Sequence, residues 1–427
     1  MNYDFKNGRE SAQELDKADK MRMYRERFYL NEGEIYMDGN SLGLCSKDAE
    51  KTLLRVLDEW KKYGIGCWSE PDIKLFLYQD YLGELLAPLI GAEPKEVTVH
   101  TNTTMNIHTS IGTFYKPTKK RYKILVDDLN FPTDRHAIDG QIKLKGLDPE
   151  KCVKVVKSRD GKMIYEEDVV EAMTDDVCIV FLPSVLYRSG QLVDMEYITK
   201  EAHKRDIIVG WDLCHSIGAV PHDFKRIDPD FAVWCNYKYL NGGPGAVAGL
   251  FINKKHFDKE AGLPGWHANV KETQFELNHR LDKAKYAGGW QSGTQSILSM
   301  APLEGSLKMY AEAGIDNLRE KSLKITEYLM YLIEIKLVKY GFSIGNPRED
   351  SKRGGHVALE HDDAIRINEA LKSEKVIPDF RYPNVIRLAP VPLYVSYGDV
   401  YELVERIVDI MENKKYDNFE NKIGAIA

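Results

Sequence analysis

IIVGWDLCH at residues 207–215 and FAVWCNYKY at residues 231–239 predict two neighbouring buried strands in this 427-residue chain. Each stretch begins with an uninterrupted apolar run, which is typical of a strand covered on both faces of a parallel sheet. Reactive side chains follow each run at once, among them Asp212, His215 and Lys238. Because ligands bind at the carboxyl edge of a doubly wound sheet, we expect Asp212 and Lys238 to face one crevice.

An amine and a carboxylate at one sheet edge suit the chemistry of pyridoxal 5'-phosphate (PLP). A lysine amine holds this aldehyde as a Schiff base, and the ring acts as an electron sink while a carboxylate keeps its nitrogen protonated. Lys238 is the candidate amine, Asp212 is the candidate carboxylate, and His215 is placed to brace the aspartate or the phosphate. The alternative is a solvated lysine and a helix-capping aspartate. The tyrosines beside Lys238 and the glycines of residues 241–245, which let backbone approach a ligand, favour the cofactor site.

Composition limits the class of protein. A chain of 427 residues that is 43% hydrophobic can bury a large core, so we expect two domains. The net charge of −7 argues against nucleic acid as a partner. The chain lacks an apolar run of about 18 residues and a secretory signal pattern, so we expect a cytoplasmic protein without a membrane partner. Its six scattered cysteines contain no Cys-x-x-Cys pair, so we expect reduced thiols and no metal site.

Strands and helices alternate regularly in the middle of the chain. The apolar patterns predict strands at residues 123–126, 152–156, 177–182, 207–211 and 231–235, with helices at 136–144, 166–173 and 195–204. A last run at 246–252 follows a tight glycine turn and is free to pair antiparallel. Such alternation predicts an α/β fold with a mostly parallel sheet that is covered on both faces.

We expect three segments along the chain. They are an N-terminal segment (1–60) that packs on the small domain, a large PLP-binding domain (61–300), and a connector helix with a small C-terminal α+β domain (301–427). The N-terminal segment reads as helical around residues 14–29. Apolar residues at helical spacing predict one long helix from about 297 to 339. A strand at 385–389 and a helix at 400–411 follow in the small domain.

Two further segments contain candidate cofactor contacts. A strand at 96–100 leads into Thr103 and Thr104 at a predicted helix start, where backbone N–H groups and hydroxyls bind anions. Ordinary helix caps are the alternative for these threonines. Phe131, in Asn-Phe-Pro-Thr-Asp at residues 130–134, is placed to cover a pyridine ring by offset stacking, with a core phenylalanine as the alternative.

Loops and the small domain contain three more candidates. Trp266 and Thr294 lie in glycine-rich loops of a kind that often belong to subunit interfaces. Arg387 interrupts an apolar run, so it is either an edge residue with a snorkelling side chain or a bidentate clamp for a carboxylate. For an enzyme that acts on an amino acid, we favour the clamp.

With these residues in view, the chain resembles the kynureninases over nearly its whole length. The resemblance is strongest in YMDGNSLGL at 36–44, FPTD at 131–134, WCNYKYLN at 234–241 and IRLAPVPLY at 386–394. It implies a fold-type I PLP-dependent transferase-like architecture, in which a large domain with a mostly parallel seven-stranded sheet joins a smaller α+β domain. It also implies a homodimer with active sites shared between subunits.

The resemblance also assigns roles to individual residues. The implied cofactor contacts are Thr103, Thr104, Phe131, Pro132, Thr133, Asp134, Asp212, His215, Tyr237 and Lys238, with Trp266 and Thr294 reaching the neighbouring subunit's phosphate region. Lys238 would carry the Schiff base and Asp212 would meet the pyridine nitrogen. Arg387 would bind the substrate α-carboxylate, and Asn40, Ser41 and Trp68 would border the substrate. This chain has Thr103 where some members carry leucine, which puts a side-chain contact there in doubt.

The implied reaction is hydrolysis of L-kynurenine to anthranilate and L-alanine, in tryptophan catabolism or NAD biosynthesis. Lys238 would be both anchor and base, with Tyr237 as the candidate acid. Trp68 and Gly293-Thr294 match the bacterial pattern, which favours kynurenine over 3-hydroxykynurenine. An aminotransferase and a non-catalytic PLP-binding protein are the alternatives. A cysteine desulfurase needs a late cysteine, and none follows Cys235.

Overall fold

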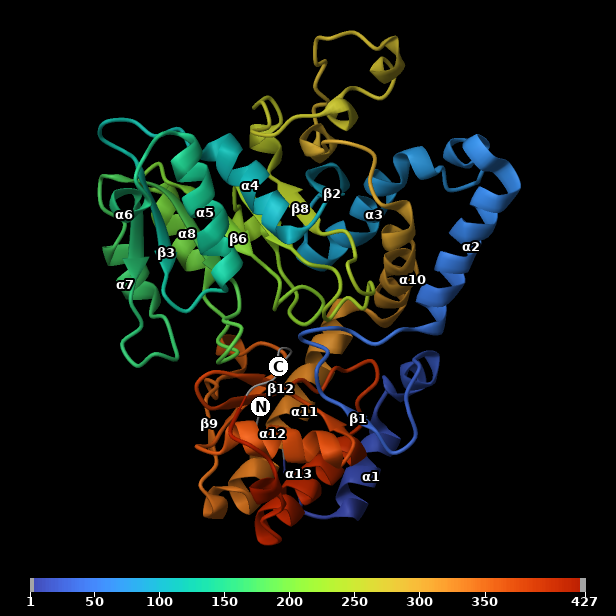
Figure 1. Ribbon diagram of the computed structural model, residues 1–427, viewed down its shortest axis with the longest axis vertical. Coiled ribbons are helices and arrows are strands. Elements are labelled where there is room, and N and C mark those ends of the chain that lie inside the picture. The colour runs from blue at the N-terminus through green and yellow to red at the C-terminus, as the bar shows by residue number, and fades with distance from the viewer. Residues whose placement is uncertain (1–3, 423–427) are drawn as a thin grey trace.

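A seven-stranded sheet forms the centre of the larger of two lobes in the computed structural model, which describes residues 4–422 (Figure 1). The strand order is β2-β8-β7-β6-β5-β3-β4. The strands are β2 (Val97–Val99), β3 (Lys123–Asp127), β4 (Val153–Val156), β5 (Val177–Pro183), β6 (Ile208–Asp212), β7 (Phe231–Trp234) and β8 (Gly249–Ile252). Strands β3 to β7 are parallel to one another, whereas β8 runs antiparallel to β7 and β2. The predicted mostly parallel sheet and the antiparallel return are therefore confirmed.

The apolar runs of the central strands are buried on both sides. In β5, Ile179 and Phe181 join one hydrophobic core, while Val180 and Leu182 join the other. The helices that follow the strands are α4 (Thr103–Phe114), α5 (Pro132–Leu144), α6 (Pro149–Cys152), α7 (Glu166–Glu171), α8 (Met195–His203) and α9 (Phe224–Ile227). Because successive side chains point to opposite faces, an unbroken apolar run is what a two-sided core requires.

The smaller lobe is built on an antiparallel sheet. Its strand order is β12-β13-β10-β9, comprising β9 (Ser343–Ile344), β10 (Val357–Glu360), β12 (Asp379–Arg381) and β13 (Val385–Leu388). Helices α11 (Ile315–Lys336) and α12 (Ala364–Ser373) contact this sheet, and α13 (Tyr397–Glu412) packs on both of them (Figure 1). Near the N-terminus, α1 (Arg9–Ala18) packs on α13, and β1 (Ile35–Tyr36) pairs in parallel with β11 (Val376–Ile377).

The single helix expected over residues 297–339 is wrong, because two helices occupy this region. α10 (Ile297–Ala313) ends at Gly314, and α11 begins directly after it. Gly314 has a φ of 77°, a conformation that side-chain-bearing residues rarely adopt and that breaks the helical path. The helix expected near 14–29 is likewise divided into α1 and a 3-10 turn (Arg22–Arg27).

Two helices before the sheet complete the larger lobe. α2 (Lys47–Tyr63) packs along α10, and α3 (Tyr78–Leu86) lies against β2 (Figure 1). Gly305 of α10 permits close packing with α2, since a Cβ there would lie 2.2 Å from the Asp48 carbonyl oxygen. Between β8 and α10, the chain contains only short 3-10 turns and projects beyond the lobe. No helix among residues 4–422 is long and apolar enough to span a bilayer.

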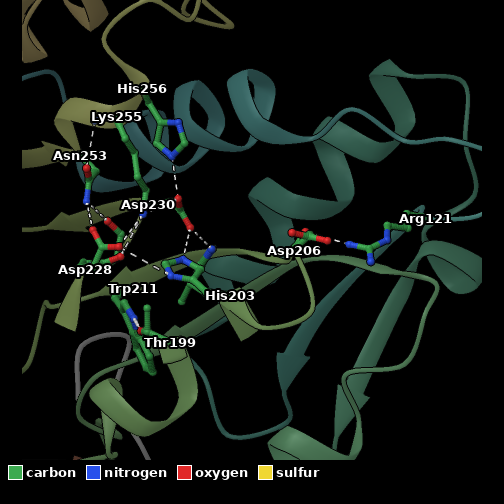
Figure 2. Close-up of polar contacts among 12 residues, drawn as sticks. Arg121, Thr199, His203, Asp206, Trp211, Asp228, Asp230, Asn253, Lys255 and His256 are labelled. Atoms are coloured by element: carbon green, nitrogen blue, oxygen red, sulfur yellow. Dashed lines mark hydrogen bonds and ion pairs between the residues drawn. The ribbon is translucent and has the colours of Figure 1, made fainter. Parts of the chain in front are cut away.

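Asp230 fixes the edge of the sheet where β6 and β7 begin (Figure 2). Its carboxylate lies 3.0 Å from His203 Nε2 and 2.6 Å from His256 Nε2, and it accepts the Val209 N–H at 2.7 Å. Burial by itself raises the pKa of Asp230, but the hydrogen bonds from His203 and His256 outweigh it, so the pKa lies well below its ordinary value. The starts of the two strands that lead to Asp212 and Lys238 are thereby held together.

Candidate functional site

A cavity of about 300 Å³ opens at the carboxyl edge of β6 and β7. Its lining residues come from both lobes and are Asn40, Ser41, Asn102, Thr103, Thr104, Phe131, Thr133, Tyr187, Asp212, Cys214, His215, Tyr237, Lys238, Arg381 and Arg387. Most of the site residues predicted from the sequence are in this set. The structure therefore brings the amine, the two threonines of α4 and the small-lobe arginine around one space.

The Lys238 amine contacts an uncharged imidazole. Lys238 Nζ lies 2.8 Å from His215 Nε2. Burial, together with the positive charges of Lys238 and Arg387, lowers the pKa of His215 well below its usual value. A neutral Nε2 can accept a hydrogen bond from the ammonium form of the lysine. His215 is therefore a fixed partner for the amine.

Two carboxyl groups lie near this pair. Asp212 ends β6, is 6% exposed, and its Oδ1 accepts the Cys214 N–H at 2.7 Å. Asp134 is 1% exposed, and within residues 4–422 neither of its oxygens has a hydrogen-bond partner of good geometry. Burial and the adjacent charge of Asp212 raise the pKa of Asp134 well above its ordinary value, although Asn130 acts the other way. Asp134 therefore favours its neutral form, and a cationic ring nitrogen is suited to lie against this pair of acids.

Hydroxyl groups and a helix start form another wall of the cavity. Thr103 and Thr104 are the first residues of α4, where several backbone N–H groups have no partner within the helix. Thr104 Oγ1 lies 2.8 Å from Thr133 Oγ1, which joins this wall to the start of α5. Pro132 is the first residue of α5 and fixes the preceding Phe131 as its N-cap. Such a helix start is suited to bind a phosphate.

Phe131 presents an open aromatic surface to the cavity. Its side chain is 46% exposed and meets the Tyr187 ring edge-on, with centroids 5.6 Å apart and an interplanar angle of 87°. A flat ligand ring can therefore stack on Phe131. The anion site, the open aromatic face, the acid pair and the amine together fit the phosphate, ring and aldehyde of PLP.

Arg387 occupies the small-lobe side of the cavity and is 1% exposed. Its guanidinium forms an ion pair with Asp379 and donates to Ser41 Oγ and to the Tyr187 carbonyl, both at 2.9 Å. Burial lowers the pKa of Arg387 to about 10, so the group stays cationic at neutral pH. Beside it, Asn40 is fully buried, and both polar atoms of its side chain lack a partner in the described chain. This corner is suited to hold a carboxylate.

Sequence reasoning missed three residues of this corner. Asp379 and Arg381 lie on β12, where Asp379 is the register partner of Arg387 and also pairs with Arg381 at 3.0 Å. The alternating charges of Asp379 and Arg381, shortly before Arg387, were the available signal. Tyr187 follows β5 at the same edge as Asp212 and had no signal beyond its place after a strand.

Three predicted site residues lie elsewhere. Trp68, Trp266 and Thr294 line a second cavity of about 720 Å³, which shares no lining residue with the first. The other residues that line it are Ile65, Ser69, Lys74, Phe76, Leu77, His267, Lys271, Glu272 and Phe275. Trp266 is 39% exposed and Phe275 is 64% exposed. Within one chain, these three residues are therefore not brought to Lys238.

The cysteines of the described chain are free thiols. Among residues 4–422, no three His, Cys, Asp or Glu side chains gather as metal ligands.

Solved structures similar to this chain share its fold. A mutant of C-DES with glycine covalently linked to the PLP cofactor superposes with a TM-score of 0.79 at 16% identity, over 90% of this chain and 99% of that one. The cysteine desulfurase from Thermococcus onnurineus NA1 gives a TM-score of 0.77 at 16% identity, over 92% and 98% of the two chains. The expected fold-type I architecture is therefore confirmed, and at this identity the likeness extends to the fold alone.

Sequence comparison identifies the family. Residues 318–407 match the model described as the kynureninase C-terminal domain. The chain is 56% identical to the kynureninase of Bacillus mycoides (strain KBAB4), over 98% of each chain. It is 51% identical to the kynureninase of Geobacillus thermodenitrificans (strain NG80-2), again over 98% of each chain. With the fold, the cavity and these relatives in agreement, the chain belongs to the kynureninase family.

Proposed function

We propose that this protein uses PLP to hydrolyse the β,γ carbon–carbon bond of L-kynurenine, producing anthranilate and L-alanine. Membership of the kynureninase family supports this reaction. The single observation that carries it is the Lys238 amine beside neutral His215 and near the Asp212–Asp134 pair. When bound, the cofactor supplies an aldehyde for the substrate amine and a protonated ring that withdraws electrons from the substrate α-carbon.

Lys238 has two tasks in this proposal. Its amine would hold the cofactor aldehyde and, in its free form, would move the proton of the substrate α-carbon. His215 Nε2, at 2.8 Å, would keep the free amine beside the site. Tyr237 is the candidate donor of the proton that the β-carbon receives. The neighbouring Cys235 thiol, together with burial, raises the pKa of Tyr237, so its phenol keeps a proton to give.

The cofactor would be held along its length by the walls of the cavity. Thr103, Thr104 and Thr133 would bind the phosphate at the start of α4. Phe131, oriented by Pro132 at the start of α5, would cover the ring. Asp212 would meet the pyridine nitrogen, with Asp134 beside it.

The substrate would lie between the cofactor and the small lobe. Arg387 would bind the α-carboxylate, in an orientation that Asp379 and Ser41 fix. The Asn40 amide, whose two polar atoms have no partner in the described chain, would border the same substrate. Arg381 and Tyr187 would complete this wall.

The second cavity supports a homodimer. Its exposed aromatic side chains form an apolar surface on one chain, which a partner subunit would cover. Trp266 and Thr294 would then complete the partner's phosphate region, and Trp68 would border the substrate ring. We further propose a cytoplasmic enzyme of tryptophan catabolism or NAD biosynthesis with a preference for kynurenine that lacks the 3-hydroxyl group.

The proposed reaction is tested by incubating the PLP-loaded protein with L-kynurenine and following anthranilate fluorescence and L-alanine release. We expect both products in equal amounts. Transfer of the amino group, seen as keto-acid formation without anthranilate, would instead identify an aminotransferase. A yellow protein that releases neither product would contradict an enzymatic role on this substrate. Parallel assays with 3-hydroxykynurenine measure the ring preference.

A further inference from the structure

His356 is a buried histidine that the proposed mechanism does not use. It directly precedes β10 in the smaller lobe, and its side chain is fully buried. Neither ring nitrogen has a hydrogen-bond partner of good geometry among residues 4–422. A buried imidazole loses solvation at two nitrogens, and the backbone of Arg188 compensates for one of them at most, so the other nitrogen calls for an explanation.

The His356 ring lies near the histidine that contacts Lys238. The ring centroids of His215 and His356 are 6.3 Å apart, with an interplanar angle of 65°. His215 uses Nε2 for Lys238, while its Nδ1 is buried and has no protein partner in the described chain. Two imidazoles joined by a direct N–H···N bond have centroids closer than this, so a contact between His215 and His356 would need one bridging water.

The structure holds His356 in this position from two sides. Asn346 Nδ2 donates to the His356 carbonyl at 2.8 Å, and Asn346 Oδ1 accepts the Ala358 N–H. The preceding Gly355 packs so closely on the larger lobe that a Cβ there would lie 3.0 Å from Ala219 Cβ. The backbone at His356 is therefore fixed at the boundary between the lobes.

The tautomer of His215 depends on what its Nδ1 meets. To accept from the Lys238 ammonium at Nε2, neutral His215 must carry its proton on Nδ1. A buried N–H without an acceptor is costly, so this tautomer needs an acceptor on the far side of the ring. His356 is a neighbouring ring whose nitrogens have no protein partner of good geometry in the described chain, and a neutral imidazole has one nitrogen free to accept.

We propose that His356 is a positioning residue, which accepts from His215 Nδ1–H through one water and so holds His215 in the tautomer that accepts from the Lys238 amine. The inference rests on the proposed role of Lys238 as the cofactor lysine. Burial, followed by the charge of Arg387, lowers the pKa of His356 to about 3, although a hydrogen bond with the Arg188 backbone raises this pKa in part. His356 is therefore neutral at working pH and acts as an acceptor, not as a charge.

Several other groups influence the same amine and imidazole. The titratable and charged side chains that face Lys238 or His215 include Asp134, Tyr187, Asp212, Cys214, Cys235, His356, Arg381 and Arg387. A variant at position 356 leaves the others in place. A change in the titration of Lys238 that appears only in such variants is thus assigned to the His356–His215 contact.

The test measures how fast the full-length protein, freed of cofactor, binds added PLP at each pH. The visible absorbance of the lysine-bound cofactor reports the reaction, and a Lys238→Ala variant provides the blank. Only the uncharged amine adds to an aldehyde, so the midpoint of the pH–rate profile reports the Lys238 amine. In His356→Leu, His215 loses its acceptor and the ammonium form loses its partner. We expect the midpoint to move to lower pH by about one unit.

Conservative and distant variants separate this role from a structural one. In His356→Gln, an amide oxygen can accept, so we expect the midpoint to return to within about 0.3 unit of the unsubstituted protein. His361→Asn, in the same lobe but away from the cavity, should leave the midpoint unchanged. An unshifted midpoint in a folded His356→Leu protein overturns the inference. Failure of the unsubstituted protein to bind PLP at Lys238 overturns the proposed function instead.

A second measurement remains decisive if His356→Leu does not fold. Imidazole ¹⁵N resonances of the ¹⁵N-histidine-labelled, unsubstituted protein identify which nitrogen of each ring carries the proton, and a His215→Gln variant assigns the His215 signals. We expect His215 protonated at Nδ1 and bare at Nε2 at neutral pH. A proton on Nε2 with a bare Nδ1 would exclude the proposed contact.

Discussion

At the scale of single residues, burial decides which groups of the site carry charge. His215 is neutral because burial and the neighbouring cations disfavour its protonation, whereas Arg387 stays cationic despite being buried. The neutral imidazole leaves the Lys238 amine with an acceptor, and the buried guanidinium provides a fixed positive charge for a carboxylate. His215 and Arg387 therefore differ in charge because of their surroundings.

Replacing Arg387 with lysine should weaken substrate binding more than it slows turnover. A lysine keeps the charge but loses the planar, bidentate geometry, and it leaves Asp379 with a poorer partner. We expect KM for L-kynurenine to rise about 100-fold, which corresponds to a loss of about 2.7 kcal/mol, with a smaller fall in kcat. Steady-state kinetics measure both constants. Arg366→Lys, on the outside of α12, is the control, and equal kinetics in the two variants would contradict the clamp.

At the scale of elements, the strands were predictable and the contacts between distant segments were not. Unbroken apolar runs such as residues 177–182 define β5 with little ambiguity, because such a strand is buried on both faces. Gly314 lies inside a helical pattern, where one glycine is usually tolerated, so the break between α10 and α11 was missed. The partnership of Asp379 with Arg387 depends on the register of β12 and β13, which local sequence does not specify.

The Asp230 cluster makes a prediction about the pH dependence of stability. The pKa of Asp230 is lowered in the folded protein, so its stabilising effect is complete above the unfolded value of about 3.9 and is lost as the pH falls below it. Asp230→Asn removes a buried charge that two histidines contact, and we expect a loss of about 3 kcal/mol at pH 7. Urea unfolding measures the difference in unfolding free energy between the unsubstituted protein and Asp230→Asn. We expect this difference to be smaller at pH 3 than at pH 7.

Asp206→Asn is the matched control for this measurement. Asp206 lies in the same region, is exposed, and has a φ of 53°, which asparagine tolerates (Figure 2). We expect the unfolding free energy of Asp206→Asn to stay within about 0.5 kcal/mol of that of the unsubstituted protein. If Asp230→Asn were no more destabilising than this control, Asp230 would not fix the starts of β6 and β7.

At the scale of the whole molecule, the separation of the two cavities leads to the prediction that a complete site needs two chains. Lys238 lines one cavity, and Trp266 and Thr294 line the other. The sequence indicated all three residues, but one chain does not bring them together. A symmetric pair of chains would bring the second cavity of each subunit to the first cavity of its partner.

Mixed dimers test this shared site. We expect Lys238→Ala and Trp266→Ala homodimers to be inactive or strongly impaired. When the two chains are coexpressed and pair at random, about half of the dimers are mixed, and one of the two sites in each mixed dimer has all native residues. Activity should therefore recover to about a quarter of the unsubstituted level. The anthranilate assay measures the recovery, and sedimentation measures the assembly. A monomeric protein, or a mixture no more active than its parts, would contradict the shared site.

The attachment of the cofactor to Lys238 is tested most directly by chemical trapping. The PLP-loaded protein is reduced with borohydride, digested, and its modified peptide is identified by mass spectrometry. We expect the cofactor mass on the peptide that contains Lys238, and no visible absorbance band in Lys238→Ala, while Lys254→Ala, at an exposed position, keeps the band. Cofactor attached to any other lysine, or a coloured Lys238→Ala protein, would contradict the assignment.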